Sequence, residues 1–216
     1  MENAKFQPTY SMVESEEMFI LSDTIVERLN KISNIFKKPE KSDIDKRIIK
    51  AFDLYSQIQK STEPVVKLVN YTTLLENLLL DKDVKDYVNW KLADRVAFLI
   101  GDQNPVFDGV IYPDFKEEEK NKGRNPNSKY VINGLVQDLY DERSTRVHSS
   151  KSSRPVEAND KWLLIGHNIL IAVVSAFLEL ESKGITSLKQ GKGSLIKCLE
   201  LMKYDGNTIS FEKLRC

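Results

Sequence analysis

The sequence is poor in cysteine and histidine, with two of each among its 216 residues. Two cysteines are too few for a disulfide framework, and Cys198 and Cys216 do not have metal-ligand spacing. With two histidines in the whole chain, a structural zinc site is not expected either. This residue usage suits a reducing compartment, so we expect a cytoplasmic protein that needs no metal and no cofactor.

The net charge is zero, because 32 Lys and Arg side chains balance 32 Asp and Glu side chains. A nucleic-acid partner would therefore be held by a local basic patch and not by bulk charge. The N-terminal stretch lacks the basic flank and continuous apolar run of a signal peptide, and we expect it to be unprocessed. No internal repeat is present.

One segment is long and apolar enough to raise the question of a membrane. The run over residues 162–178 is shorter than the ~20 residues that a bilayer demands and contains Gly166, His167, Asn168 and Ser175. A helix that is apolar on all sides is also typical of the centre of a helical bundle. We interpret this run as a buried core helix and expect no membrane partner.

Helical periodicity covers most of the chain, and no convincing strand pattern interrupts it. Apolar spacing, caps and breakers predict helices over residues 25–36, 42–60, 64–79, 86–101, 130–147 and 194–204, and a long apolar helix that begins after Asp160. Ser42 or Asp43 can cap the second of these, and Asn127 or Ser128 the helix over 130–147. The fold class is therefore predicted to be all-α.

The expected domain organisation has three parts. Residues 1–41 form a partly helical N-terminal extension, residues 42–205 a helical domain and residues 206–216 a C-terminal tail. Residues 1–41 either belong to the bundle or are the remnant of an upstream domain. Residues 102–129 are polar and punctuated by proline and glycine, which predicts a long loop. Such loops are often functional, although a plain solvated insertion is an equally good interpretation.

The helix over 130–147 combines apolar and basic residues on one face. That face comprises Val131, Ile132, Leu135, Val136, Leu139, Tyr140 and Val147. Arg143 and Arg146 project from the middle of it, and guanidinium groups on a buried face must meet acids or line a cleft that admits an anion. Glu142 is positioned to pair with Arg146 four residues later. Arg143 has no suitable acid nearby in sequence, so its partner is a ligand or a distant residue, for which Glu76 is the best candidate.

The end of this helix is locally positive. Between Arg143 and Pro155 there is no acidic residue, whereas four residues are basic, namely Arg143, Arg146, Lys151 and Arg154. Phosphate is the natural anion for such a place. His148 lies at the end of the same helix, where spacing alone favours a contact with the helix dipole over catalysis. His167, inside the apolar helix, is expected to be a satisfied core residue.

Three blocks of the sequence, taken together in their order along the chain, resemble a known family. ERSTRVHSS is similar to the motif of HEPN domains, in which four to six residues separate an Arg from a His, and LVQDLYDE matches the helix that leads into it in the Apea-like branch. Upstream, YTTLLENLLLDKDVKDYVNWKLADRVAFLIG resembles the paired helices of that branch. The resemblance covers about residues 44–180. Ser144 stands where active relatives commonly have Asn, Asp or His, and Ser149 where Gly often follows the His.

This resemblance implies a HEPN-type helical bundle, with a long loop before the motif helix, that forms a homodimer in which two motifs meet. The implied activity is metal-independent cleavage of RNA, in toxin systems or antiviral defence, with an antitoxin or regulatory protein as a further partner. Arg143 would hold the scissile phosphate and His148 would be the acid or base. The motif's other expected site residues are Ser144, Arg146 and Lys151 for substrate binding and Glu76 and Tyr140 in support.

The implied chemistry is consistent with these residue types. Cleavage without metal uses the 2′-hydroxyl as nucleophile, and it needs a base near pH 7, an acid, and positive charge at the phosphorane. Two copies of His148 and Arg143, brought together in a dimer, would supply all of these. Two alternatives remain open: a non-cleaving HEPN module for dimerisation or nucleotide binding, and a plain helical interaction protein in which Glu76 and Glu142 neutralise the two arginines.

Overall fold

The computed structural model describes residues 23–101, 128–148, 161–189, 194–197 and 199, without the side chains of residues 23–25 and 148. The helices are α1 (Asp23–Lys37), α2 (Asp43–Lys60), α3 (Pro64–Leu79), α4 (Val88–Ile100), α6 (Lys129–His148) and α7 (Lys161–Ser182). Within these ranges no strand is present, although an isolated bridge joins Ser187 to Ser194. The prediction of an all-α fold is confirmed.

Local sequence signals set the ends of the helices much as predicted. Ser42 forms a capping box with Asp45, because each side chain accepts a hydrogen bond from the backbone N–H of the other, at 2.9 and 3.0 Å. Pro64 occupies the first turn of α3, where its missing N–H is not needed. The Ser128 hydroxyl accepts from the N–H of Val131 at the start of α6. Residues 102–127 of the predicted loop and the whole predicted tail, 206–216, lie outside the described residues.

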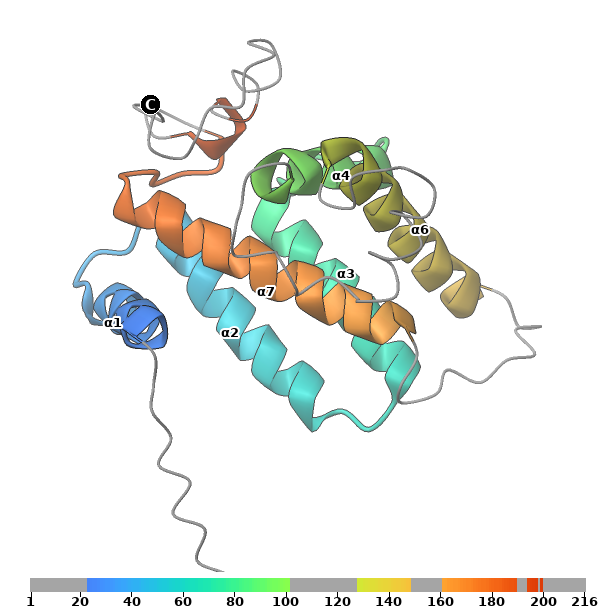
Figure 1. Ribbon diagram of the computed structural model, residues 1–216, viewed down its shortest axis with the longest axis horizontal. Helices are drawn as coiled ribbons and strands as arrows, with labels where there is room; N and C mark the ends of the chain where they lie inside the picture. Colours follow the sequence, from blue (N-terminus) through green and yellow to red (C-terminus); the bar gives the residue numbers. More distant parts are fainter. Residues whose placement is uncertain (1–22, 102–127, 149–160, 190–193, 198, 200–216) are drawn as a thin grey trace, which may run out of the picture.

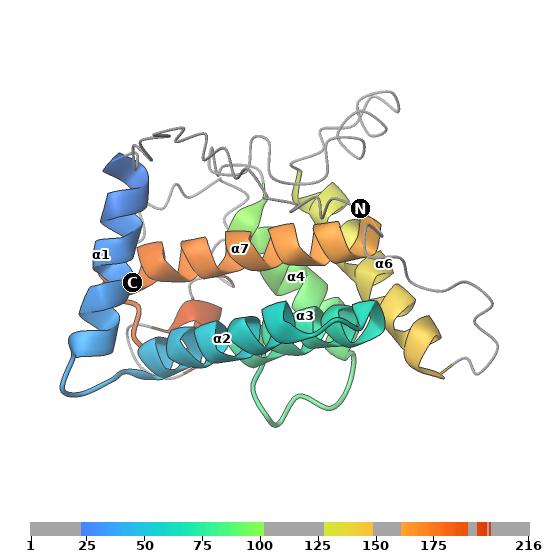
Figure 2. The same cartoon turned by 90° about the horizontal axis from the view of Figure 1, so that it is seen from below.

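The long apolar helix is the centre of the bundle. α7 contacts α1, α2, α3, α4 and α6, and it lies alongside α2 and α3 in both views (Figures 1 and 2). By length and composition α7 is apolar enough to cross a membrane. Its buried residues, however, include Ile165, Ile169, Val173 and Phe177, each at most 2% exposed, as expected for a core helix. The interpretation of this run as a buried helix therefore agrees with its packing.

α1 is held at the end of the bundle opposite to α6 (Figure 2). Lys31 donates to Glu179 of α7 at 2.7 Å. Lys38 forms ion pairs with both Asp45 of α2 and Glu181 of α7. Burial opposes the ionisation of Asp45, but the hydrogen bonds from Lys38 and Ser42 outweigh it, so the pKa of Asp45 is lowered from its ordinary 3.8. Part of the N-terminal extension thus packs directly on the helical domain.

Helix α6, which ends in the predicted motif, packs against α4. Asn133 of α6 donates to Asp94 of α4 at 2.8 Å. At the end of α4, Gly101 approaches the start of α6 so closely that a Cβ there would lie 2.9 Å from Cγ of Lys129. This approach requires a glycine. α6 packs against both α4 and α3 (Figure 1).

Candidate functional site

The apolar face of α6 is shorter than the sequence predicts. Val131, Ile132, Leu135, Val136 and Leu139 are at most 6% exposed, as expected, but Val147 is 48% exposed. The prediction that Val147 shares the buried face is therefore wrong. The reason is that the last turns of α6 extend past the neighbouring helices in both views (Figures 1 and 2). Arg143 and Arg146 consequently lie at the rim of the core, each half-buried, and not in its middle.

Arg143 is held against an aromatic ring from its own helix. Its Cζ lies 5.2 Å from the centroid of the Tyr140 ring, within the range of a cation–π interaction. Its Nε is buried and has no hydrogen-bond partner among the described residues. In the same part of the chain no ion pair joins Arg143 to an acid. The guanidinium is thus positioned but not neutralised.

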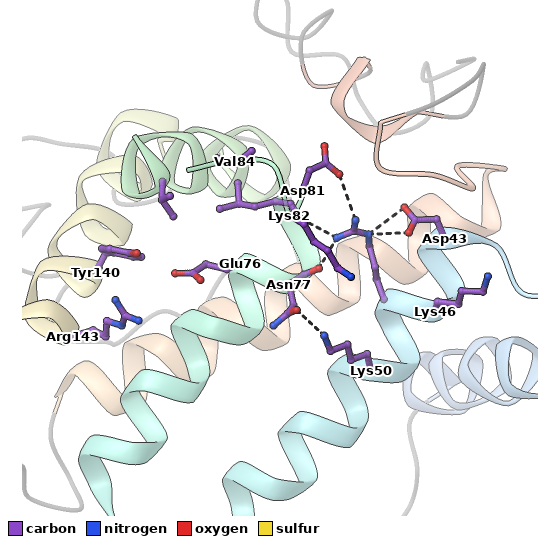
Figure 3. Close-up of a pocket in the computed structure, with 13 residues that line it drawn as sticks. Asp43, Lys46, Lys50, Glu76, Asn77, Asp81, Lys82, Val84, Tyr140 and Arg143 are labelled. Atoms are coloured by element: carbon purple, nitrogen blue, oxygen red, sulfur yellow. Dashed lines mark hydrogen bonds and ion pairs between the residues drawn. The ribbon is translucent and has the colours of Figure 1, made fainter. Parts of the chain in front are cut away.

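Glu76, from the last turn of α3, faces the same place (Figure 3). Its Oε1 is also buried without a hydrogen-bond partner in the part of the chain that is described. Tyr140 lies near both charges: burial raises the pKa of its hydroxyl, the Glu76 carboxylate raises it further, and Arg143 lowers it. The sequence named Glu76 as a distant partner of Arg143, and the fold brings Glu76, Tyr140 and Arg143 into one cleft without pairing the two charges.

The cleft has a volume of about 520 Å³. It is lined by Asp43, Lys46, Arg47, Lys50, Glu76, Asn77, Leu80, Asp81, Lys82, Val84, Val88, Tyr140 and Arg143. Figure 3 places Arg143 and Tyr140 at one side, Glu76 between, and Lys46 and Lys50 at the far side on α2. A cleft of this size, with charged groups converging on it, is suited to a small anionic ligand or to part of a larger one.

No family model, curated protein or solved structure matches this chain. What the site can do is therefore argued from its own residues.

Arg47 of α2 organises the far side of the cleft. Its guanidinium donates to the Asn77 and Leu80 carbonyls at 2.6 and 3.1 Å, at the end of α3. It also pairs with Asp43 at 3.2 Å and with Asp81 at 3.6 Å. A cation at the C-terminus of a helix is favoured by the helix dipole. Sequence reasoning did not identify this cluster, although the spacing of Lys46, Arg47 and Lys50 already indicates one basic face of α2.

The remaining predicted residues have different outcomes. Arg146 pairs with Glu142 at 2.5 Å, as the spacing predicted, and its side chain is 12% exposed. Ser144 is half-buried on α6, directly after Arg143. His148 is the last residue of α6, five positions after Arg143 or about 7.5 Å further along the axis, but its side chain is outside the description. Lys151 lies outside the described residues altogether.

His167 of α7 is half-buried at the edge of the core, next to two tyrosines. Its Nδ1 lies 3.3 Å from the Tyr55 hydroxyl, and its ring packs edge-on against that of Tyr71. Burial lowers the pKa of His167 from its ordinary 6.5. The contact with Tyr55 agrees with the prediction of a satisfied residue, although the side chain is half-buried and not part of the core. Among the described residues, no group of three or more His, Cys, Asp or Glu side chains is placed to hold a metal ion.

Proposed function

We propose that the protein is a HEPN-type, metal-independent endoribonuclease that cleaves RNA through the 2′-hydroxyl at a site shared by two copies. The observation that carries the proposal is the state of Arg143, a half-buried cation at one side of a largely basic cleft. The Nε of Arg143 has no hydrogen-bond partner in the described part of the chain. A fixed, unneutralised guanidinium suits a phosphorane, whose negative charge grows as the reaction proceeds. The three blocks of sequence that resemble HEPN domains support the same assignment.

In this proposal His148 moves the protons. A neutral imidazole accepts the proton of the 2′-hydroxyl, the 2′-oxygen attacks phosphorus, and a protonated imidazole donates to the departing 5′-oxygen. The products are a 2′,3′-cyclic phosphate and a 5′-hydroxyl. One chain has a single motif, so the second imidazole comes from the other copy across a two-fold axis close to the motif helix. Ser144, Arg146 and Lys151 would contact the substrate, with Tyr140 and Glu76 fixing Arg143.

The experiment is cleavage of labelled single-stranded RNA in EDTA by the purified protein, by Arg143→Ala and by His148→Ala. Lys37→Ala, which changes an exposed lysine of α1, is the matched control. Each motif variant is expected to lose at least ~100-fold in rate, because a positioned acid or base contributes about that much. Thermal melting should be nearly unchanged, since Arg143 lies at the rim of the core.

Three outcomes would contradict the proposal. If His148→Ala cuts at the wild-type rate, the catalytic assignment is wrong. If EDTA stops cleavage and magnesium restores it, the metal-independent mechanism is wrong. If the unaltered protein binds RNA or a nucleotide without cutting, the non-cleaving HEPN module, which retains Arg143 and does not need His148, replaces the nuclease.

A further inference from the structure

The cleft that contains Arg143 continues well beyond the motif helix. It passes Glu76 and Asn77 of α3 and reaches Lys46 and Lys50 of α2 (Figure 3). These two lysines are far from the motif in sequence, and both are exposed. The motif alone therefore does not account for this part of the cleft.

The charges of the cleft do not cancel. Its basic residues are Lys46, Arg47, Lys50, Lys82 and Arg143, and its acidic residues are Asp43, Glu76 and Asp81. Arg47 is engaged by Asp43 and Asp81 and by two carbonyls, so its guanidinium is held within the protein. Over the whole cleft, five basic side chains against three carboxylates leave an excess of two positive charges. The excess of positive charge calls for an anion that extends over several of these groups.

The arrangement of the charges indicates which anion. Lys50 donates to the Asn77 side chain at 2.8 Å, which orients its ammonium group without neutralising it. Positive charge is present at both sides of the cleft, and the Glu76 carboxylate, with its unpartnered Oε1, lies between them. A carboxylate there would repel clustered phosphates but would accept a hydrogen bond from a hydroxyl or amino group. The pattern suits phosphates that are separated by hydroxyl-bearing sugars.

We propose that this cleft binds the RNA strand next to the scissile phosphate, with Lys46, Lys50 and Lys82 contacting backbone phosphates and Glu76 accepting a hydrogen bond from a ribose hydroxyl or a base. The inference rests on the proposed function, because Arg143 marks the end of the cleft at which the strand is cut. Phosphate groups are also carried by free nucleotides, which the test must distinguish from a strand. The clustered phosphates of a nucleoside triphosphate fit the central carboxylate less well.

The test measures binding separately from cleavage. A labelled single-stranded RNA dodecamer is titrated with His148→Ala protein in EDTA at several salt concentrations, by fluorescence anisotropy. The same measurement is made after Lys46, Lys50 and Lys82 are all changed to Ala. For single strands each phosphate contact contributes about 0.7 to the slope of log K against log salt, so the slope should become shallower by about 2. At low salt the affinity should fall at least tenfold.

The matched control changes Lys37, Lys60 and Lys91 to Ala, since these are three exposed lysines outside the cleft. It removes the same net charge and should leave the slope nearly unchanged. Circular dichroism melting checks that both triple variants fold, and Lys82→Glu alone, an exposed charge reversal, should weaken binding in the same direction. Equal effects of the two triple variants would overturn the proposal, because bulk charge would then explain the binding.

Free nucleotide is the other arm of the experiment. ATP is titrated alone and as a competitor of the RNA. Suppose that ATP binds at one site per chain, that the triple lysine variant no longer binds ATP, and that this variant still binds RNA with unchanged affinity. The cleft is then a nucleotide site and the strand proposal fails. Lysine-dependent RNA binding by a protein that never cuts RNA would instead refute the proposed function and show that the cleft is a strand-binding site without cleavage.

Discussion

Arg143 lies against the ring of Tyr140, with its Cζ 5.2 Å from the ring centroid, and forms no ion pair with Glu76 in the described part of the chain. The cation that we propose binds phosphate is thus restrained by an aromatic face and not by an acid. A ring restrains the guanidinium without neutralising its charge, whereas a paired carboxylate would have to be displaced by the substrate. This contact distinguishes Arg143 from Arg146, which is paired with Glu142.

The Tyr140 ring is therefore expected to matter more than its hydroxyl. Tyr140→Phe keeps the ring beneath Arg143 and should retain RNA cleavage within about threefold. Tyr140→Leu removes the cation–π contact, worth about 0.5–2 kcal/mol, and should lower the rate by roughly 2- to 30-fold. The measurement is kcat/KM on labelled RNA, with Tyr130→Leu on the exposed start of α6 as control. A Phe variant as impaired as the Leu variant would assign the effect to the hydroxyl.

Glu76→Gln should lower the pKa of Tyr140. The negative charge of Glu76 is the second cause of the raised pKa, after burial, and the amide removes that charge while keeping the size of the side chain. The pKa should therefore fall, with burial still raising it and Arg143 still lowering it. NMR titration of ¹³C-labelled tyrosine measures the shift, and Asp83→Asn in the exposed α3–α4 connection should not produce it. An unchanged Tyr140 titration in Glu76→Gln would show that the carboxylate points away.

Asp45→Ala should destabilise the fold by about 2–3 kcal/mol. The change removes the capping box with Ser42 and the partner of Lys38 at a side chain that is 1% exposed. Because the pKa of Asp45 is lowered in the fold, its contribution is complete above its ordinary 3.8 and is lost as pH falls through the folded value. Urea unfolding at several pH values should show the difference from wild type shrinking below about pH 4. Asp53→Ala, on the exposed face of α2, is the control, and a constant difference down to pH 2 would contradict the explanation.

His167 should make the protein less stable in mild acid. Its pKa is lowered in the fold, so below its ordinary 6.5 the unfolded chain binds a proton that the folded chain does not, and stability falls as pH decreases toward the folded value. His167→Gln should remove this part of the pH dependence, as measured by urea unfolding between pH 7 and pH 5. If the wild-type slope persists in the variant, another group is responsible.

Much of the helical framework was predictable because its signals are local. The capping residue Ser42, the early proline Pro64 and the terminal glycine Gly101 lie next to the backbone that they affect. The pairing of Glu142 with Arg146 was predictable for the same reason, since it spans one turn of a helix.

The parts that were missed depend on packing between distant segments. Periodicity extends the apolar face of α6 to Val147, but burial ends where the neighbouring helices end. The cluster around Arg47 could not be predicted because it joins α2 to carbonyls at the end of α3, some 30 residues away in sequence. The catalytic and binding roles of all the predicted site residues stay predictions, and the His148 side chain and Lys151 also lie outside the described residues.

The shared active site is the central claim, and its most direct test is the dependence of specific activity on protein concentration. RNA cleavage in EDTA is measured over a dilution series while mass photometry reports the fraction of dimer in the same samples. Activity per chain should follow the fraction of dimer and approach zero as the protein becomes monomeric, because one chain supplies only one His148 and one Arg143. Full specific activity in samples that are demonstrably monomeric would contradict the shared site and require a mechanism built on a single chain.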